Sequence, residues 1–254
     1  MILRAVELFA ISLVASTFGS MVGLGGGFLM VPALRVLFGL HHAIAAGTSL
    51  ILIVFNSASA AVAYLRQRTV NLRVGGWLAA GALPGSIAGA FTVTQISGKV
   101  FDFSLAALIL LLATDLITNF DKRFGEMRRE HEGRAMPAPV ALLGGLVVGF
   151  VSSLFGIGGG IVVLPMLLYL STLTMHAISA TSNFVIALSS PVGLITHVLQ
   201  HDVDLAYGIP LLLGGVGGGQ LGARMAKRVP AAHLGRWLAA ALVVAAGGLI
   251  WKHL

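Results

Sequence analysis

The chain has 254 residues, of which 57% are hydrophobic and only 10% are charged, and its mean hydropathy is +0.96. Soluble domains carry about 25% charged residues, so this composition excludes a soluble globular protein and predicts an integral membrane protein. The formal net charge of +7 does not indicate a nucleic-acid partner, because Lys and Arg are confined to short segments between long apolar runs. Cysteine is absent, which excludes a disulfide framework.

A membrane-spanning helix needs about 20 apolar residues, and this length divides the chain into eight long helices and two short ones. In chain order the expected helices are 5–22, 27–38, 43–64, 74–95 and 100–119, followed by 139–155, 160–171, 176–199, 205–223 and 233–251. The second helix of each half is the short one. The stretch 120–138 is the most polar and is interpreted as a solvated linker.

The two halves of the chain are predicted to be copies of one unit. Gly23-Leu24-Gly25-Gly26-Gly27 returns 133 residues later as Gly156-Ile157-Gly158-Gly159-Gly160. At the same offset, Val70-Asn71-Leu72 returns as Val203-Asp204-Leu205. Glycines spaced four apart also recur, and such spacing is expected to let helices pack closely. These glycines are Gly81, Gly85 and Gly89, with Gly214, Gly218 and Gly222 as their counterparts.

Equivalent loops of the two copies carry opposite charge. Residues 65–73 hold three Arg, whereas the counterpart His201-Asp202-Val203-Asp204 holds neither Lys nor Arg. In the next loop the bias reverses, with only Lys99 in the first copy and four basic residues in the second. Because positive loops stay cytoplasmic, this alternation predicts inverted copies and a cytoplasmic linker. An inverted copy crosses the membrane an odd number of times, so the Gly-rich breaks before the short helices are expected at membrane depth.

The predicted fold class is therefore an all-α polytopic membrane protein built from two inverted-topology repeats. We expect a first transmembrane repeat at 1–119, a cytoplasmic polar linker at 120–138 and an inverted second repeat at 139–254. No separate soluble domain is expected, because the linker is short.

Each Gly-rich break opens directly into a short apolar helix. The first N–H groups of that helix and the positive end of its dipole then lie beside flexible backbone, which favours an anion-binding site. The alternative is that the glycines only allow close packing or a kink. Hydroxyl and amide groups near the start of the next helix would donate to an oxyanion, unless they bond to their own or a neighbouring helix. The candidate substrate-binding residues are Gly25, Gly26, Gly27, Thr48, Ser49, Asn56, Gly158, Gly159, Gly160, Thr181, Ser182 and Asn183.

A second set of candidates is titratable. His42 and His176 occupy matching places in the two repeats after a one-residue slip. Because histidine titrates near neutral pH, both are candidates for proton coupling or gating, and Asp115 is the best candidate for a proton relay. The alternative is that all three lie at helix ends in the membrane interface.

The remaining charged residues carry weaker predictions. Glu7 and Asp102 are expected at the membrane interface, and Arg35 is expected to extend toward the surface, with neutralisation of an anion as the alternative. No role is predicted for His41, His197 or His201. The sequence carries no nucleophile motif, phosphate loop or metal-protease motif, so we expect no enzyme activity, no metal and no cofactor.

Several of these motifs together resemble those of the TauE/SafE sulfite exporter family, over nearly the whole chain. They are Gly23-Leu24-Gly25-Gly26-Gly27-Phe28-Leu29-Met30-Val31-Pro32, Gly47-Thr48-Ser49, Val70-Asn71-Leu72, Gly156-Ile157-Gly158-Gly159-Gly160-Ile161-Val162-Val163-Leu164-Pro165 and Ala180-Thr181-Ser182-Asn183-Phe184. The resemblance implies a bacterial-type inner-membrane permease for sulfur-containing anions, such as sulfite and organosulfonates. It does not fix the substrate, because the motifs are shared across the family.

From the residues and the resemblance we expect a secondary transporter, an exporter of small sulfur-containing anions, that works by alternating access with the anion near the midplane. Its expected partners are the anionic substrate, the lipid bilayer and coupled protons, and a homo-oligomer is left open. The alternatives are a carrier of carboxylates, a metal-ion carrier with His42 and His176 as ligands, a channel, and a non-transporting scaffold that docks through 120–138.

Overall fold

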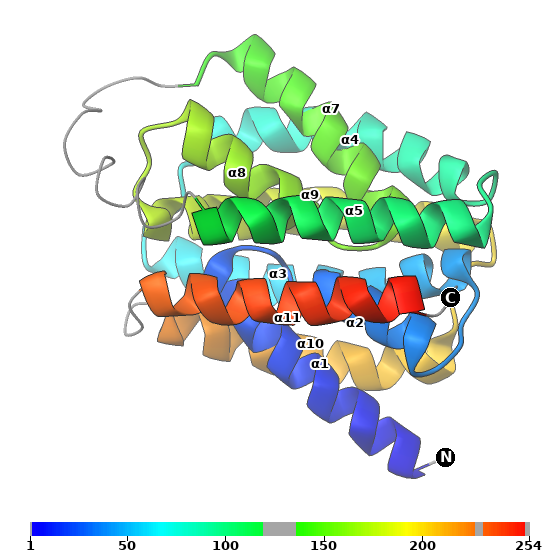
Figure 1. Ribbon diagram of the computed structural model, residues 1–254. Coiled ribbons are helices and arrows are strands. Elements are labelled where there is room, and N and C mark those ends of the chain that lie inside the picture. Colours follow the sequence, from blue (N-terminus) through cyan, green and yellow to red (C-terminus); the bar gives the residue numbers. More distant parts are fainter. Residues whose placement is uncertain (1, 119–135, 227–230, 252–254) are drawn as a thin grey trace.

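The computed structural model describes residues 2–118, 136–226 and 231–251, which form ten α-helices and no strand (Figure 1). The predicted helix order is confirmed, with eight long helices and two short ones. The first half contains α1 (Ile2–Val22), α2 (Gly27–Val36), α3 (His42–Arg66), α4 (Leu72–Val93) and α5 (Gly98–Thr118). The second half contains α7 (Ala138–Phe155), α8 (Gly160–Leu170), α9 (Met175–Leu199), α10 (Leu205–Met225) and α11 (Ala231–Trp251). Most of the predicted linker, up to residue 135, lies outside the described residues.

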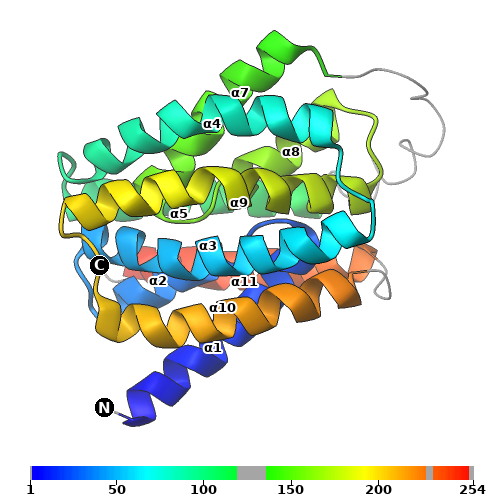
Figure 2. The same ribbon diagram turned by 180° about the vertical axis from the view of Figure 1, so that it is seen from behind.

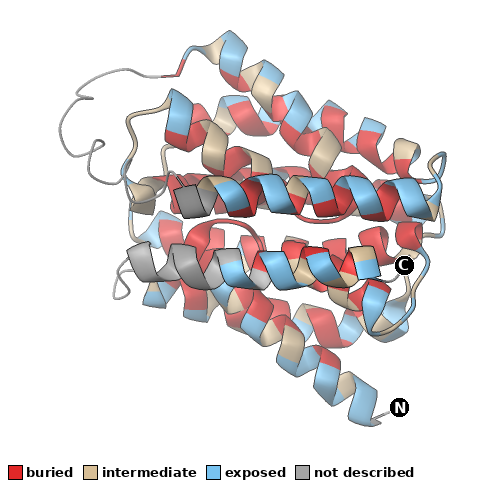
Figure 3. Cartoon of the chain, viewed as in Figure 1, coloured by how far each residue is buried: buried red, intermediate tan, exposed pale blue. Residues whose placement is uncertain are grey.

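The chain is a polytopic membrane protein. Five helices are long and apolar enough to cross a membrane by length and composition, namely α1, α3, α4, α7 and α9. Large apolar side chains also face outward, as with Leu111 of α5 and Val244 of α11, which are 70% and 75% exposed (Figure 3). So much exposed apolar surface is suited to lipid and not to water.

The helices of the two halves are interleaved. Viewed from behind, α4, α9, α3 and α10 lie side by side in that order (Figure 2). On the other face α5 and α11 lie against each other (Figure 1). The outer helix α7 packs along α4, and α1 packs along α10, so the first helix of each half contacts the fourth helix of the other half.

The glycine ladders explain why these two helix pairs pack so closely. A Cβ atom built at Gly85 of α4 would lie 2.1 Å from the carbonyl oxygen of Leu146 in α7. A Cβ atom at Gly218 of α10 would lie 2.5 Å from the Cβ atom of Ser16 in α1. Any side chain at either glycine would force the backbones apart, so the predicted packing role of the ladders is confirmed.

The central helices α3 and α9 run in opposite directions. Gly47, near the start of α3, lies against His197, near the end of α9. Tyr64, near the end of α3, shares an apolar cluster with Ala180, near the start of α9. Because α3 and α9 are the equivalent helices of the two halves, their antiparallel contact is what an inverted repeat requires.

Candidate functional site

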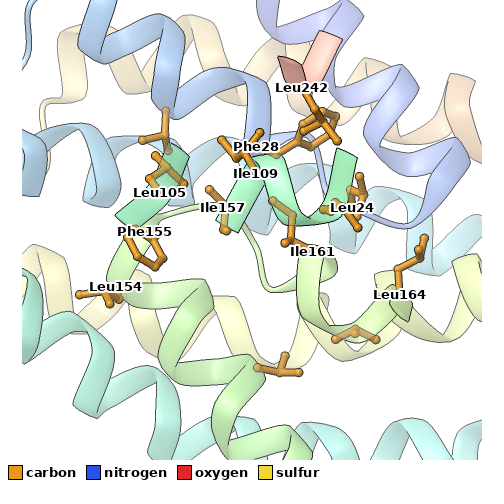
Figure 4. Close-up of a cluster of buried hydrophobic side chains, with 14 of the residues drawn as sticks. Leu24, Phe28, Leu105, Ile109, Leu154, Phe155, Ile157, Ile161, Leu164 and Leu242 are labelled. Atoms are coloured by element: carbon orange, nitrogen blue, oxygen red, sulfur yellow. The ribbon is translucent and has the colours of Figure 1, made fainter. Parts of the chain in front are cut away.

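Two short stretches of non-helical backbone interrupt the bundle at equivalent positions. One joins α1 to α2 and the other joins α7 to α8. The last residues of these breaks, Gly26 and Gly159, have φ values of 80° and 67°, a left-handed conformation that favours glycine. The middle residues, Leu24 and Ile157, are fully buried in one apolar cluster (Figure 4). Each break is therefore anchored in the core by its own apolar side chain.

The two breaks lie directly against each other. A Cβ atom built at Gly27, the first residue of α2, would lie 2.8 Å from the carbonyl oxygen of Gly156. A Cβ atom at Gly160, the first residue of α8, would lie 2.6 Å from the carbonyl oxygen of Gly23. These two contacts are related by the repeat, so the N-termini of both short helices meet at one place inside the bundle. The sequence predicted the breaks but not that they touch.

The meeting point brings together two helix ends that carry partial positive charge. Neither Gly26 nor Gly159 offers a side-chain cap, and neither short helix has an acidic residue in its first turn. The first N–H groups of a helix lack partners within the helix, and each N-terminus acts as about half a positive charge. Ile53 of α3 and its repeat counterpart Ile186 of α9 lie against the breaks, at Gly158 and Gly25 respectively. The charge is therefore held in apolar surroundings.

Two serines of the predicted site hold the breaks in place. Ser49 of α3 donates a hydrogen bond to the carbonyl oxygen of Gly156, at 2.6 Å. Ser182 of α9, its repeat counterpart, donates to the carbonyl oxygen of Gly23. Each serine thus binds the break of the other half. Because each hydroxyl donates its hydrogen bond to a break carbonyl, it holds the break in this conformation.

The two asparagines of the predicted site also contact backbone. Asn56 donates from Nδ2 to the carbonyl oxygen of Gly25, at 2.8 Å, and its Oδ1 accepts from Ser20, at 2.7 Å. Asn183 donates to the carbonyl oxygens of Ser20 and Ser179, at 3.1 and 2.9 Å. Asn56 therefore fixes the first break directly, whereas Asn183 fixes the end of α1 that leads into it.

The two threonines lie away from the breaks, where they join the halves at the helix starts. Thr48 Oγ1 accepts from the backbone N–H of Asp204, at 2.9 Å, and Thr181 Oγ1 accepts from the backbone N–H of Asn71, at 3.0 Å. Asn71 and Asp204 in turn cap α4 and α10 with their side chains. The repeated Val-Asn/Asp-Leu motif therefore serves helix capping, a role that its spacing alone did not indicate.

The titratable candidates are widely separated. His42 begins α3 and lies 3.2 Å from the carbonyl oxygen of Val93, while His176 lies at the start of α9. Because α3 and α9 are antiparallel, the two histidines lie toward opposite ends of the bundle and cannot ligate one ion. Among the described residues there is no group of three His, Cys, Asp or Glu that could hold a metal. Asp115 accepts a hydrogen bond from Tyr169 of α8, near the end of α5.

The prediction that Arg35 extends toward the surface is wrong, because Arg35 is 6% exposed and pairs with Asp102, which is 1% exposed. The guanidinium contacts both carboxylate oxygens, with Nε donating to Oδ1 at 2.7 Å, and Nη1 donates to the carbonyl oxygen of Leu40. This ion pair compensates both buried charges, so Arg35 neither extends to the membrane surface nor has its charge available for an anion. Glu7, by contrast, is exposed.

Two inverted half-bundles whose broken helices meet inside the bundle define a membrane transporter of the inverted-repeat class. The chain belongs to the sulfite exporter TauE/SafE family, whose model matches residues 8–249.

Three relatives are each described as a probable membrane transporter protein. YunE of Bacillus subtilis is 31% identical over 245 residues, covering 88% of this chain and 89% of the relative. A protein of Xylella fastidiosa is 30% identical over 245 residues, covering 91% and 89%. YfcA of Escherichia coli K12 is 28% identical over 218 residues, covering 86% and 79%. No solved structure matches the chain.

Proposed function

We propose that this protein exports small sulfur-containing anions, such as sulfite or organosulfonates, across the bacterial inner membrane. The observation that supports this proposal best is the meeting of two uncapped helix N-termini, those of α2 and α8, with no acidic side chain in either first turn. A small anion would relieve the repulsion between these two positive helix ends. The family name supports the sulfur-containing class of anion.

In this proposal the anion binds to backbone N–H groups at the start of α2 and α8. Glycine at positions 27 and 160 lets the two helix starts approach each other closely, so that their N–H groups lie near one place. Ser49, Ser182 and Asn56 keep the breaks in shape through their bonds to break carbonyls. The apolar Ile53 and Ile186 exclude water, which strengthens the interaction of the anion with the helix ends.

Transport then follows by alternating access. Each break is held by a serine of the other half, so a movement of one half against the other changes the shape of both breaks together. The contacts of Thr48 with Asp204 and of Thr181 with Asn71 lie toward opposite ends of the antiparallel central helices. Opening one contact while the other stays closed would expose the anion to one side of the membrane at a time.

The proposal is tested with purified protein in liposomes. We expect saturable exchange of radiolabelled sulfite, inhibited by sulfoacetate and much less by sulfate or acetate. Protein-free liposomes give the leak that is subtracted. Exchange that acetate inhibits as strongly as sulfoacetate would favour the carboxylate carrier, and no exchange of any of these anions by folded protein would overturn the proposal.

A further inference from the structure

A buried histidine that the anion site does not use lies near the end of α9. His197 is fully buried, and its Nε2 lies 3.0 Å from the carbonyl oxygen of Ser153 in α7. The repeat counterpart of His197 is Tyr64, whose hydroxyl donates to the carbonyl oxygen of Ser20 in α1, at 2.9 Å. Both halves therefore use the side chain of an aromatic residue at this position as a donor to a carbonyl oxygen of their first helix. Only His197, in the second half, has a further ring nitrogen that can bind a proton.

The hydrogen bond to Ser153 fixes where the proton of the neutral ring lies. A carbonyl oxygen can only accept, so Nε2 carries the hydrogen and Nδ1 carries the lone pair. Nδ1 lies 3.8 Å from Oδ2 of Asp202, and neither atom has a hydrogen-bond partner among the described residues. Two acceptors thus face each other in a buried place. A proton bound to Nδ1 would turn this unfavourable contact into an ion pair.

Asp202 is the charged group that faces His197. α9 packs against α1, α3, α4, α7 and α8, and α7 carries no titratable side chain. The titratable side chains on the described parts of the others are Arg4, Glu7, His42, Tyr64, Arg66, Arg73 and Tyr169. Arg66 and Arg73 lie at the opposite end of the bundle, and Arg4 and Glu7 are exposed. His42 is at the same end but is directed at the carbonyl oxygen of Val93.

The neighbouring turn adds His201, which is exposed, and Asp204, which caps α10. The position that matches Asp202 in the first half is Thr69, which is uncharged and donates to the carbonyl oxygen of Tyr64. The titratable pair is therefore present in one half only.

The pair lies where the two halves touch. A Cβ atom built at Gly47 of α3 would lie 2.2 Å from the carbonyl oxygen of Asp202 and 3.1 Å from Cβ of His197. The next residue, Thr48, accepts the backbone N–H of Asp204. The turn between α9 and α10 therefore packs against the start of α3 (Figure 2). A change in charge at His197 and Asp202 therefore acts on the contact that alternating access would open.

We infer that His197 and Asp202 together bind a proton whose movement across the membrane is coupled to anion transport. One proton is carried in each cycle. This inference rests on the proposed function, because it names the coupling ion of the same transporter. The turn between α9 and α10 carries no Lys or Arg, and such loops face away from the cytoplasm. The Asp202 side chain is 14% exposed, so in this conformation the pair takes up its proton from that side. When the halves move against each other, the pair faces the other side and releases the proton there.

Two substitutions remove the proton site while keeping its surroundings. Asp202→Asn keeps the shape of the side chain, and His197→Tyr installs the ring that the first half uses at this position. His201→Asn is the matched control, because His201 is an exposed histidine in the same turn. Wild type and variants are compared in liposomes by two measurements, sulfite exchange at equal pH and sulfite accumulation driven by a pH difference. Since sulfite itself takes up a proton near neutral pH, only the difference between wild type and variant counts.

With one proton per anion, a pH difference of one unit sustains about a tenfold sulfite gradient in the wild type, beyond the gradient that sulfite protonation alone gives. We expect both variants to lose this additional gradient while keeping sulfite exchange, and the control to keep both.

Sulfite exchange also reports whether a variant folds, and Asp202→Asn alone decides the test if His197→Tyr does not fold. An unchanged gradient in a variant that exchanges sulfite would overturn the inference, as would a wild type that exchanges sulfite without any response to the pH difference beyond that of sulfite itself. A wild type that exchanges no anion would instead overturn the proposed function.

Discussion

Gly160 at the start of α8 lies so close to Gly23 of the other half that a Cβ atom at Gly160 would come within 2.6 Å of the Gly23 carbonyl oxygen. The matching contact joins Gly27 to Gly156. The two breaks are thus one structural unit, although 133 residues separate them in the chain. A disturbance in one break must reach the other.

Gly160→Ala is expected to abolish anion transport, because the added methyl group must push the two breaks apart. Overpacking of this kind costs about 1–3 kcal/mol, so the protein should still fold with a lower thermal midpoint. Gly76→Ala is the matched control, since no atom lies within 4 Å of a Cβ atom at Gly76. Sulfite exchange and thermal unfolding in detergent measure both effects. Wild-type exchange by Gly160→Ala would show that the contact between the breaks is not needed.

Ser49→Ala and Ser182→Ala are expected to reduce sulfite exchange to a similar degree, because the repeat gives both serines the same bond to a break carbonyl. Loss of one such bond costs about 0.5–1.5 kcal/mol. Ser57→Ala is the control, because Ser57 is buried on the same helix as Ser49 and bonds only to carbonyls of its own helix. Exchange rates at several sulfite concentrations separate a change in binding from a change in maximal rate. Equal losses of sulfite exchange in Ser57→Ala and Ser49→Ala would show that the bond to the break carbonyl has no specific role in transport.

The sequence predicted the elements of this fold because each depends on local pattern. Apolar runs predicted the helices, the 133-residue offset predicted the repeat, and loop charge predicted the inversion. The pattern could not predict which side chains meet between segments that are far apart in the chain. Ser49 bonds to a residue 107 positions away, and Arg35 pairs with Asp102 at a separation of 67. His197 carried no prediction because its partner is set by a turn and by the neighbouring helix.

Arg35→Gln is expected to destabilise the protein strongly, because it removes the positive charge that compensates the buried Asp102 carboxylate. Breaking a buried ion pair from one side costs about 3–5 kcal/mol. The double variant Arg35→Met with Asp102→Leu removes both charges, so it should recover much of the lost stability. Thermal midpoints of the single and double variants measure the difference. A single variant as stable as the wild type would mean that the ion pair contributes little to the fold.

Arg68→Cys and His201→Cys are expected to be labelled from opposite sides of the membrane. The two residues occupy equivalent turns, after α3 and after α9, and both have a left-handed backbone, with φ of 56° and 61°. The wild-type chain has no cysteine, so each variant carries a single reactive thiol. The positive charge near Arg68 predicts that this turn faces the cytoplasm, so a membrane-impermeant maleimide should label intact spheroplasts only at His201→Cys. Permeabilised spheroplasts should be labelled at both positions, which controls for accessibility. Labelling of both variants in intact spheroplasts would contradict the inverted topology.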